Sequence, residues 1–413
     1  MTTTMAGDRY LTLDTVRGVA VLGILLLNII GFAMPMPAYF NPAAYGGAEG
    51  IDLGVWLGNF ILFDGKMRGL FSFLFGASTL LVIERATAKG ESAAGVHYAR
   101  MIWLLAFGLV HLWAIWFGDI LSHYALIGMI AFFFRNARIK TLLIVGCILL
   151  VPQFIVTAFI PLVAAMAQIT PAQPGMEKAL EGLNEAFGQP SEAWLTKEVA
   201  LFRGDWWSIA VDRFKETKWL PLVGLIQYGW ETLAYMLFGM AAYRSGMLTG
   251  QWERRRYWRW VAIGFGIGIP AYAALALWMI RSDFRLFEVT AASMVLTTPI
   301  RPLMIMGWAS LIVLLMRPGG FLTDRLAAAG RMAFTNYLGT SLICTTIFYG
   351  YGLGWFGALS RAEVYLVVLG VWTLILLWSK PWLERFAYGP LEWLWRSLAR
   401  GRPQAMAGGA ITH

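Results

Sequence analysis

The sequence has few charged residues and almost no cysteine. Only 14% of its 413 residues are charged and 58% are hydrophobic, with a mean hydropathy of +0.61, whereas soluble proteins carry about 25% charged residues. The two cysteines, Cys147 and Cys344, both lie inside apolar runs, which excludes a disulfide framework and a zinc site. A Walker loop, a dinucleotide fingerprint, a nucleophile elbow and metal-spaced His/Cys clusters are also missing. This inventory predicts neither a tightly bound cofactor nor a metal site.

What the sequence does contain is a series of apolar runs long enough to cross a bilayer, which takes roughly 20 residues in a helix. They predict an all-α, polytopic membrane bundle of about ten spans. The expected spans are 12–33, 68–84, 101–117, 120–134, 141–164, 220–243, 258–280, 286–316, 332–350 and 362–379.

The distribution of basic residues predicts the orientation of these spans. With the N-terminus in the cytoplasm, most lysines and arginines fall in loops on the cytoplasmic side. The opposite short loops hold only Lys66, Arg68, Arg281, Arg285 and Arg361. This is the positive-inside pattern, so both termini are expected in the cytoplasm. The net charge of +9 therefore reflects membrane topology and predicts no nucleic-acid partner.

The spans divide the chain into two membrane-embedded halves, 1–165 and 219–400. Between them, residues 166–218 are rich in charge and have helical apolar spacing, which predicts a helical extracytoplasmic cap. The cap is either a lid or a long connection. The last segment before 400 is expected to be an amphipathic interfacial helix with a Glu392–Arg396 pair, and 401–413 a disordered tail.

The first span carries an unusual polar stripe. Asp14, Arg17 and Asn28 fall within an arc of about 60° at 100° per residue, so one narrow face of an apolar helix is polar. Lipid does not solvate such a face, which is expected to line protein or a water-filled cavity. Alternatively, Asp14 and Arg17 form a simple ion pair at the interface.

A histidine lies deep in the hairpin formed by the third and fourth spans. His111 is expected some six residues inside a turn made by Gly118 and Asp119, roughly 9 Å at the helical rise. Asp119 and His123 are four residues apart and share a face. His111 is either a structural residue bonded to a neighbouring span or a general base in a pocket.

Other ionisable residues fall at membrane depth. A short apolar stretch at 52–63 is expected to deliver Asp64 and Lys66 to the outer rim, Glu231 lies within the sixth span, and Arg301 lies between two prolines that kink the eighth. The basic and aromatic stretch 254–259 reads as an anchor at the inner leaflet, although a phosphorylated donor would require the same charges.

Five motifs occur in an order that resembles a known family. They are LDTVRGVAVLGILLLNI, FDGKMRGLFSFLFG, GLVHLWAIWFGDIL followed by HYALIG, GRMAFTNYLGTSLICTTIFYGYGLG, and RFAYGPLEWLWRS. Together they resemble the YeiB-like family of bacterial membrane proteins, over nearly the whole chain. The first-span motif is similar to that of the transmembrane acyltransferase superfamily, which includes heparan-alpha-glucosaminide N-acetyltransferase.

The resemblance implies a multi-pass protein of the bacterial inner membrane that passes an acyl group from cytoplasmic acyl-CoA to an extracytoplasmic or lipid-linked acceptor. The heparan enzyme uses a histidine after its first span, and residues 34–52 contain none, so His111 is the expected substitute. Asp119 or Asp64 would orient the imidazole. The expected substrate-binding residues are Lys66, Asn28, Tyr124, Glu231, Arg301 and Asn336, and those for acyl-CoA are Asp14, Arg17 and Arg331.

Two other functions remain open at this point. The same intramembrane charges would serve a transporter for a small anionic solute, and a non-catalytic scaffold is the third alternative. The expected partners are the lipid bilayer, acyl-CoA or another small-molecule substrate, and a second copy of the chain.

Overall fold

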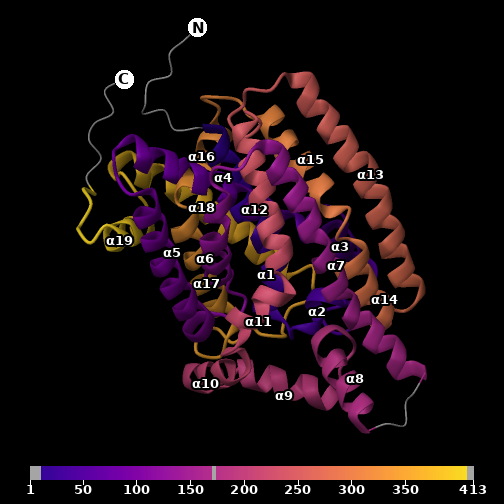
Figure 1. Cartoon of the computed structure of the whole chain (residues 1–413). Helices are drawn as coiled ribbons and strands as arrows, with labels where there is room; N and C mark the ends of the chain where they lie inside the picture. The colour runs from indigo at the N-terminus through magenta and orange to yellow at the C-terminus, as the bar shows by residue number, and fades with distance from the viewer. Residues whose placement is uncertain (1–10, 170–173, 407–413) are drawn as a thin grey trace.

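The computed structural model describes residues 11–169 and 174–406, and in this part of the chain the secondary structure is helical (Figure 1). The helices of the first half and the cap are α1 (Leu11–Ala33), α2 (Pro37–Phe40), α3 (Gly50–Leu62), α4 (Lys66–Ala88), α5 (Ala93–Val110), η1 (His111–Ile115), α6 (Leu121–Ala131), η2 (Phe132–Phe134), α7 (Ile139–Ile169), α8 (Pro174–Phe187), α9 (Glu192–Phe202) and α10 (Trp206–Thr217). Those of the second half are α11 (Leu220–Gln227), α12 (Gly229–Arg244), α13 (Arg254–Arg281), α14 (Leu286–Thr290), η3 (Ala291–Leu296), α15 (Arg301–Leu315), α16 (Phe321–Arg331), α17 (Ala333–Phe348), α18 (Val364–Arg385) and α19 (Pro390–Ala399).

The described helices confirm a multi-pass, all-α membrane protein. Six of them are long and apolar enough to cross a bilayer, and a seventh candidate is the pair Leu286–Leu296 and Arg301–Leu315. The two members of this pair are bent by 59° where Pro299 and Pro302 predict a kink. The remaining predicted spans correspond to shorter segments: α6 with η2, α11 with α12, and α17. A total of ten spans, with both termini cytoplasmic, stays a prediction.

The end of α5 differs from the sequence-based expectation. Instead of running as an α-helix to a two-residue turn, the chain changes to a π-helix at His111–Ile115 and reaches α6 only after an irregular stretch at 116–120. The predicted tight turn at Gly118 and Asp119 is therefore wrong. The wider π turn changes the direction of the side chains that follow and is a feature often found at functional sites.

Helix α1 lies at the centre of the bundle and contacts α16 at backbone distance. A Cβ atom on Gly330 would lie 1.9 Å from the carbonyl oxygen of Asp14, and one on Gly18 would lie 1.9 Å from that of Leu326. Only glycine at both positions permits this approach. It fixes the first turns of α1, which carry Asp14 and Arg17, beside the end of α16, which carries Arg331.

Helix α5 connects two peripheral elements that lie at opposite ends of the bundle (Figure 1). At its start, Trp395 of α19 donates a hydrogen bond of 2.8 Å to the Arg100 carbonyl. At its end, Trp206 of the cap helix α10 donates a bond of 2.9 Å to the Ala114 carbonyl. The cap is helical as predicted, apart from 170–173, which lie outside the described residues.

The expected tail at 401–413 is only partly described, since 407–413 lie outside the described residues. Residues 401–406, which the sequence predicts to be disordered, have a described conformation. They fold back on α19, where Trp393 donates a 2.7 Å bond to the Gln404 carbonyl and the Ala387 amide donates a 3.0 Å bond to the Met406 carbonyl.

The contact between α1 and α16 predicts a specific sensitivity to added volume. Gly330→Ala is expected to destabilise the protein by about 1–3 kcal/mol, because the new methyl group overlaps the α1 backbone. Gly370→Ala on α18 is the matched control, since a Cβ at that exposed helical position meets nothing within 4 Å. The apparent Tm in detergent should fall for the first variant and stay or rise slightly for the control; equal melting of the two would contradict this packing.

Candidate functional site

A cavity of about 250 Å³ lies where eight helices meet. Its lining comes from the start of α1, from α4, from α5, from the start of α6, from the junction of α16 and α17, from the end of α18 and from α19. Most of the lining is apolar, and its polar or charged members are Asp14, Arg17, Ser78, Thr79, Arg85, His97, Arg100, Tyr124, Arg331, Tyr337, Tyr388, Glu392 and Arg396.

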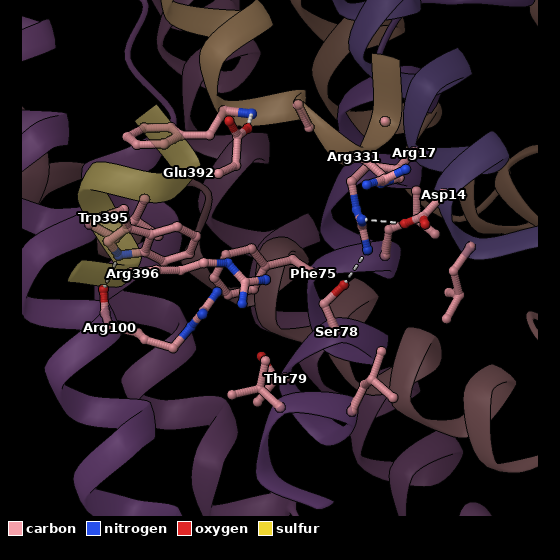
Figure 2. A pocket seen from close by; sticks show the side chains of 18 of the residues that line it. Asp14, Arg17, Phe75, Ser78, Thr79, Arg100, Arg331, Glu392, Trp395 and Arg396 are labelled. Carbon is pink, nitrogen blue, oxygen red and sulfur yellow. Dashed lines mark hydrogen bonds and ion pairs between the residues drawn. The ribbon is translucent and has the colours of Figure 1, made fainter. Parts of the chain in front are cut away.

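The mouth of this cavity carries an excess of positive charge. Five arginines line it against two carboxylates. Arg17 pairs with Asp14 at 2.9 Å and donates a 2.8 Å bond to Ser78. Figure 2 shows Arg17, Asp14 and Arg331 on one side of the cavity and Arg100 and Arg396 on the other. Asp14 and Arg17 thus form the predicted ion pair and also line this cavity, whereas Asn28, the third member of the predicted polar stripe, does not.

Glu392 has a different role from the predicted i,i+4 partner of Arg396 on a surface helix. Its carboxylate is buried and accepts bonds from the backbone N–H groups of Phe334 at 2.7 Å and Thr335 at 3.1 Å, as well as from the Thr335 hydroxyl. It therefore caps the start of α17 (Figure 2) and satisfies amides that otherwise lack a partner in a helix. Glu392 holds α19 against the cavity wall.

Two buried tyrosines line the cavity. Arg85 at the mouth is exposed, whereas Tyr124 and Tyr337 are buried. The Tyr124 hydroxyl contacts Ser72 at 2.7 Å, and the Tyr337 hydroxyl donates to the Gly118 carbonyl at 3.2 Å. Tyr124, which the sequence analysis names as a substrate-binding residue, lines this cavity, and its role in binding stays a prediction.

Behind Tyr337 lies a hydrogen-bonded chain of three buried side chains. His111 Nδ1 lies 2.9 Å from Asp119 Oδ1, and His111 Nε2 lies 2.9 Å from Ser341 Oγ. Asp119 also accepts bonds from the Leu121 and Ser122 amides at the start of α6. Because this carboxylate is an acceptor, a neutral His111 donates from Nδ1 and accepts from Nε2. The ring of Tyr337 is 5.2 Å from that of His111, centroid to centroid.

This geometry decides between the two carboxylates that the sequence offers as partners of His111. Asp119 contacts the imidazole, and the other ring nitrogen is occupied by Ser341. Asp64, the alternative, lies instead in a second, smaller cavity beside Asn59 and Tyr39. The orientation of His111 therefore comes from Asp119 alone.

A second ionic group lies at the start of α4, which carries Arg68. Glu231 forms ion pairs with both Arg68 and Arg301 and accepts a 2.7 Å bond from the Tyr235 hydroxyl. Arg301 also donates a 2.8 Å bond to the Thr297 hydroxyl in the bent α14–α15 segment. The predicted residues Glu231 and Arg301 meet here, but neither lines the arginine-rich cavity.

Lys66 is buried near this group. Its ammonium donates a 2.6 Å bond to the Phe60 carbonyl and lies 3.1 Å from the centroid of the Tyr272 ring. Both contacts join α3, α4 and α13. Lys66 thus lies inside the bundle, whereas the sequence predicts a position on the outer rim. Its aliphatic stem packs among aromatic side chains, and its ammonium faces the Tyr272 ring.

Three further sequence-based assignments lie away from the cavity. Asn28 is half-buried and lines neither of the two cavities reported for the described residues. The Asn336 amide joins α16 and α18 through the Ala329 carbonyl and Ser379. The basic stretch 254–259 forms the start of α13 and does not line the cavity, so it cannot hold a donor there.

Comparison with known proteins assigns the chain to a family. A family model described as "Protein of unknown function (DUF418)" matches residues 242–402. The chain is 34% identical over 414 residues to "Uncharacterized protein YeiB" of Escherichia coli (strain K12). The alignment covers 95% of this chain and 96% of the relative. It belongs to the DUF418, or YeiB-like, family.

Similarity within the DUF418 family extends beyond one bacterial group. The chain is 31% identical over 411 residues to "Uncharacterized protein YxaH" of Bacillus subtilis (strain 168), with 95% of each chain covered. No solved structure matches the chain. The region matched by the DUF418 model includes Tyr337, Ser341 and Glu392, whereas His111 and Asp119 lie before it.

Sequence reasoning missed several residues of this site. Ser341, Tyr337, Arg85, Arg100 and the capping role of Glu392 were not predicted. One signal was present for Ser341, since Phe334, Tyr337 and Ser341 follow the i, i+3, i+7 spacing of a single helix face. Nothing in that spacing indicates which other helix the face meets.

The Glu231 network predicts a large effect of a small change. Glu231→Gln leaves the buried Arg301 and the half-buried Arg68 without a carboxylate and is expected to cost about 3–5 kcal/mol of stability. The control Tyr235→Phe removes only one hydrogen bond to the same carboxylate and is expected to cost about 1 kcal/mol. Thermal melts in detergent compare the two, and similar Tm values for both variants would contradict an ionised Glu231 that balances Arg68 and Arg301.

Proposed function

We propose that this membrane protein is an acyltransferase that takes an acyl group from cytoplasmic acyl-CoA. The proposal rests on one observation: an arginine-lined cavity leads into the bundle towards a histidine that is hydrogen-bonded to a buried carboxylate. The likeness of the first-span motif to transmembrane acyltransferases supports it. In this proposal the arginine-lined end faces the cytoplasm of a bacterial inner membrane, as the positive-inside pattern predicts.

The two parts of the cavity suit the two parts of a CoA thioester. Arginine side chains bind phosphate oxygens through paired N–H donors, and Arg17, Arg100, Arg331 and Arg396 surround the mouth. The apolar lining farther in suits an acyl group and its linking arm. The cavity holds only part of such a ligand, so the nucleotide would lie at the mouth among the arginines.

The depth of the bundle also fits this ligand. Arg100 and His111 are eleven residues apart along α5 and η1, which corresponds to about 16 Å at the α-helical rise. This is comparable to the length of the extended pantetheine arm that separates the diphosphate of CoA from its sulfur. Phosphates held at Arg100 would therefore bring the thioester close to Tyr337 and His111.

The proposed chemistry needs a base and a group that keeps it oriented. His111 would take the proton from an attacking hydroxyl or amine, and Asp119 would fix the tautomer that leaves Nε2 free to accept it. Asp119 would also stabilise the imidazolium that forms. The acceptor would approach from the cap side, where α10 contacts η1 through Trp206 and Arg213.

Transport of a small anionic solute is the alternative, and the same cations would serve it. Neither His111 nor Ser341 is among the residues that line the described cavity, and a cavity bounded in this way suits a donor pocket better than a path through the membrane. A transporter would also leave the Asp119–His111–Ser341 chain without a role.

Binding of acyl-CoA provides the first test. Acetyl-CoA and palmitoyl-CoA are added to the detergent-solubilised protein, and at least one is expected to raise its Tm because it binds the folded state. Arg100→Gln should require about ten times more ligand to give the same Tm shift, which corresponds to a loss of roughly 1.4 kcal/mol of binding free energy. Arg255→Gln is the control, because Arg255 is exposed and lies outside the cavity.

Activity provides the second arm of this test. His111→Ala should retain the Tm shift and lose transfer to added acceptor hydroxyls or amines. Absence of any CoA-dependent shift in the wild-type protein, together with solute uptake by liposomes that contain it, would reject the acyltransferase and favour the transporter.

A further inference from the structure

The helix faces that line the cavity lead to Ser341, which the sequence analysis does not name as a site residue. On α17, Ala333, Phe334 and Tyr337 line the cavity, and Ser341 follows Tyr337 by four residues on the same face. It therefore lies one helical turn, about 5.4 Å, beyond the last cavity-lining residue of α17.

The facing helix shows the same continuation. On α5, Arg100, Met101 and Leu104 line the cavity, and the face that carries them leads through Gly108 to His111. Gly108 brings α5 into backbone contact with the start of α6, since a Cβ there would lie 2.2 Å from the Ser122 amide nitrogen. Two helix faces that form the cavity thus converge on the pair His111 and Ser341.

The order of hydrogen bonds in this pair is that of an activated nucleophile. Asp119 orients His111 through Nδ1, and His111 Nε2 lies 2.9 Å from Ser341 Oγ, within reach for proton transfer. The side chains of Asp119 and His111 are fully buried, and Ser341 is 1% exposed. The other contact of Ser341 is a longer bond of 3.3 Å to the Tyr337 carbonyl, so the imidazole is its closer partner.

We propose that Ser341 is a catalytic nucleophile that carries the acyl group as a seryl ester between donor and acceptor. The inference rests on the proposed acyltransferase function and specifies its route. Ser341 Oγ loses its proton to His111 Nε2 and bonds to the thioester carbonyl carbon; the C–S bond breaks, and the CoA thiolate leaves with the proton from His111. No group is oxidised or reduced.

The second half reaction returns the enzyme to its starting state. An acceptor hydroxyl or amine loses its proton to His111 and bonds to the carbonyl carbon of the seryl ester. The ester C–O bond breaks, and Ser341 Oγ takes the proton back from His111. Because the ester separates the two halves, donor and acceptor need not occupy the buried site together.

Tyr337 controls access in this route. Its side chain stands between the cavity and the His111–Ser341 pair, and its hydroxyl is held by two long bonds, 3.2 Å to the Gly118 carbonyl and 3.3 Å from the Ile120 amide. Both partners lie in the irregular stretch 116–120 that follows η1. A rotation of this ring, with the loss of two weak bonds, would bring the thioester to Ser341.

The experiment is a search for the ester on the full-length protein in lipid nanodiscs. The protein is mixed with radiolabelled acetyl-CoA or palmitoyl-CoA without acceptor, quenched in acid and digested for mass spectrometry. Wild-type protein is expected to retain label close to one acyl group per chain, on the peptide that contains Ser341. Ser341→Ala and His111→Ala should each reduce it at least a hundredfold, while the neighbouring control Thr340→Ala keeps it.

A second variant separates chemistry from folding. Ser341→Cys should hold the label as a thioester that neutral hydroxylamine releases, whereas the wild-type ester resists it; this shift in lability is not expected from a structural serine. Transfer to acceptor without label on residue 341 would overturn the nucleophile while the acyltransferase function survives. Absence of both transfer and CoA-dependent stabilisation would remove the acyltransferase function as well.

Discussion

The constraint on which this structure depends is that polar groups at bilayer depth must find their partners inside the protein. The chain meets it in two ways. Some groups form closed sets, such as Glu231 between Arg68 and Arg301, or Asn336 between α16 and α18. These sets join helices and leave little polar capacity unused. The lining of the arginine-lined cavity differs from these sets in its charge, since it holds five arginines and two carboxylates.

A lining with more arginines than carboxylates suits an anionic ligand. Glu392, one of the two carboxylates, is already engaged by the first amides of α17. Asp14 is engaged by Arg17. A ligand with several phosphate oxygens would complete the set, and the apolar walls below would receive what that ligand carries.

The π-helix at the end of α5 carries His111, the central residue of the hydrogen-bonded chain beyond the cavity. An α-helical continuation through 111–115 would place the following residues in a different register and at a shorter distance from α6. The wider turn leaves the stretch 116–120 free to carry Asp119 to His111 Nδ1, while Nε2 faces Ser341 on α17. Backbone geometry in one turn thus brings together His111 of η1, Ser341 of α17 and Asp119 of the stretch between η1 and α6.

The sequence predicts the class of fold and part of the site, but not its assembly. Apolar length gives the membrane helices, two prolines give the bend before Arg301, and helical spacing brings Asp14 and Arg17 to one face. The pairing of His111 with Asp119 is within reach because the two are close in the chain. The contacts of Ser341 and Glu392 could not be predicted, because their partners lie 230 and 58 residues away in sequence. Periodicity within one helix does not indicate which other helix it contacts. The π-helix could not be predicted either, because nothing in the sequence HLWAI distinguishes it from a turn of an α-helix.

One measurement addresses the central claim most directly: a cryo-EM structure of the full-length protein with a non-hydrolysable thioether analogue of acyl-CoA. The predicted result places the phosphates among Arg17, Arg100 and Arg396, the sulfur beyond a rotated Tyr337 ring, and the adjoining carbon next to Ser341 Oγ. An analogue bound elsewhere, or phosphates at the mouth with the acyl group directed into lipid and Tyr337 unmoved, would contradict it.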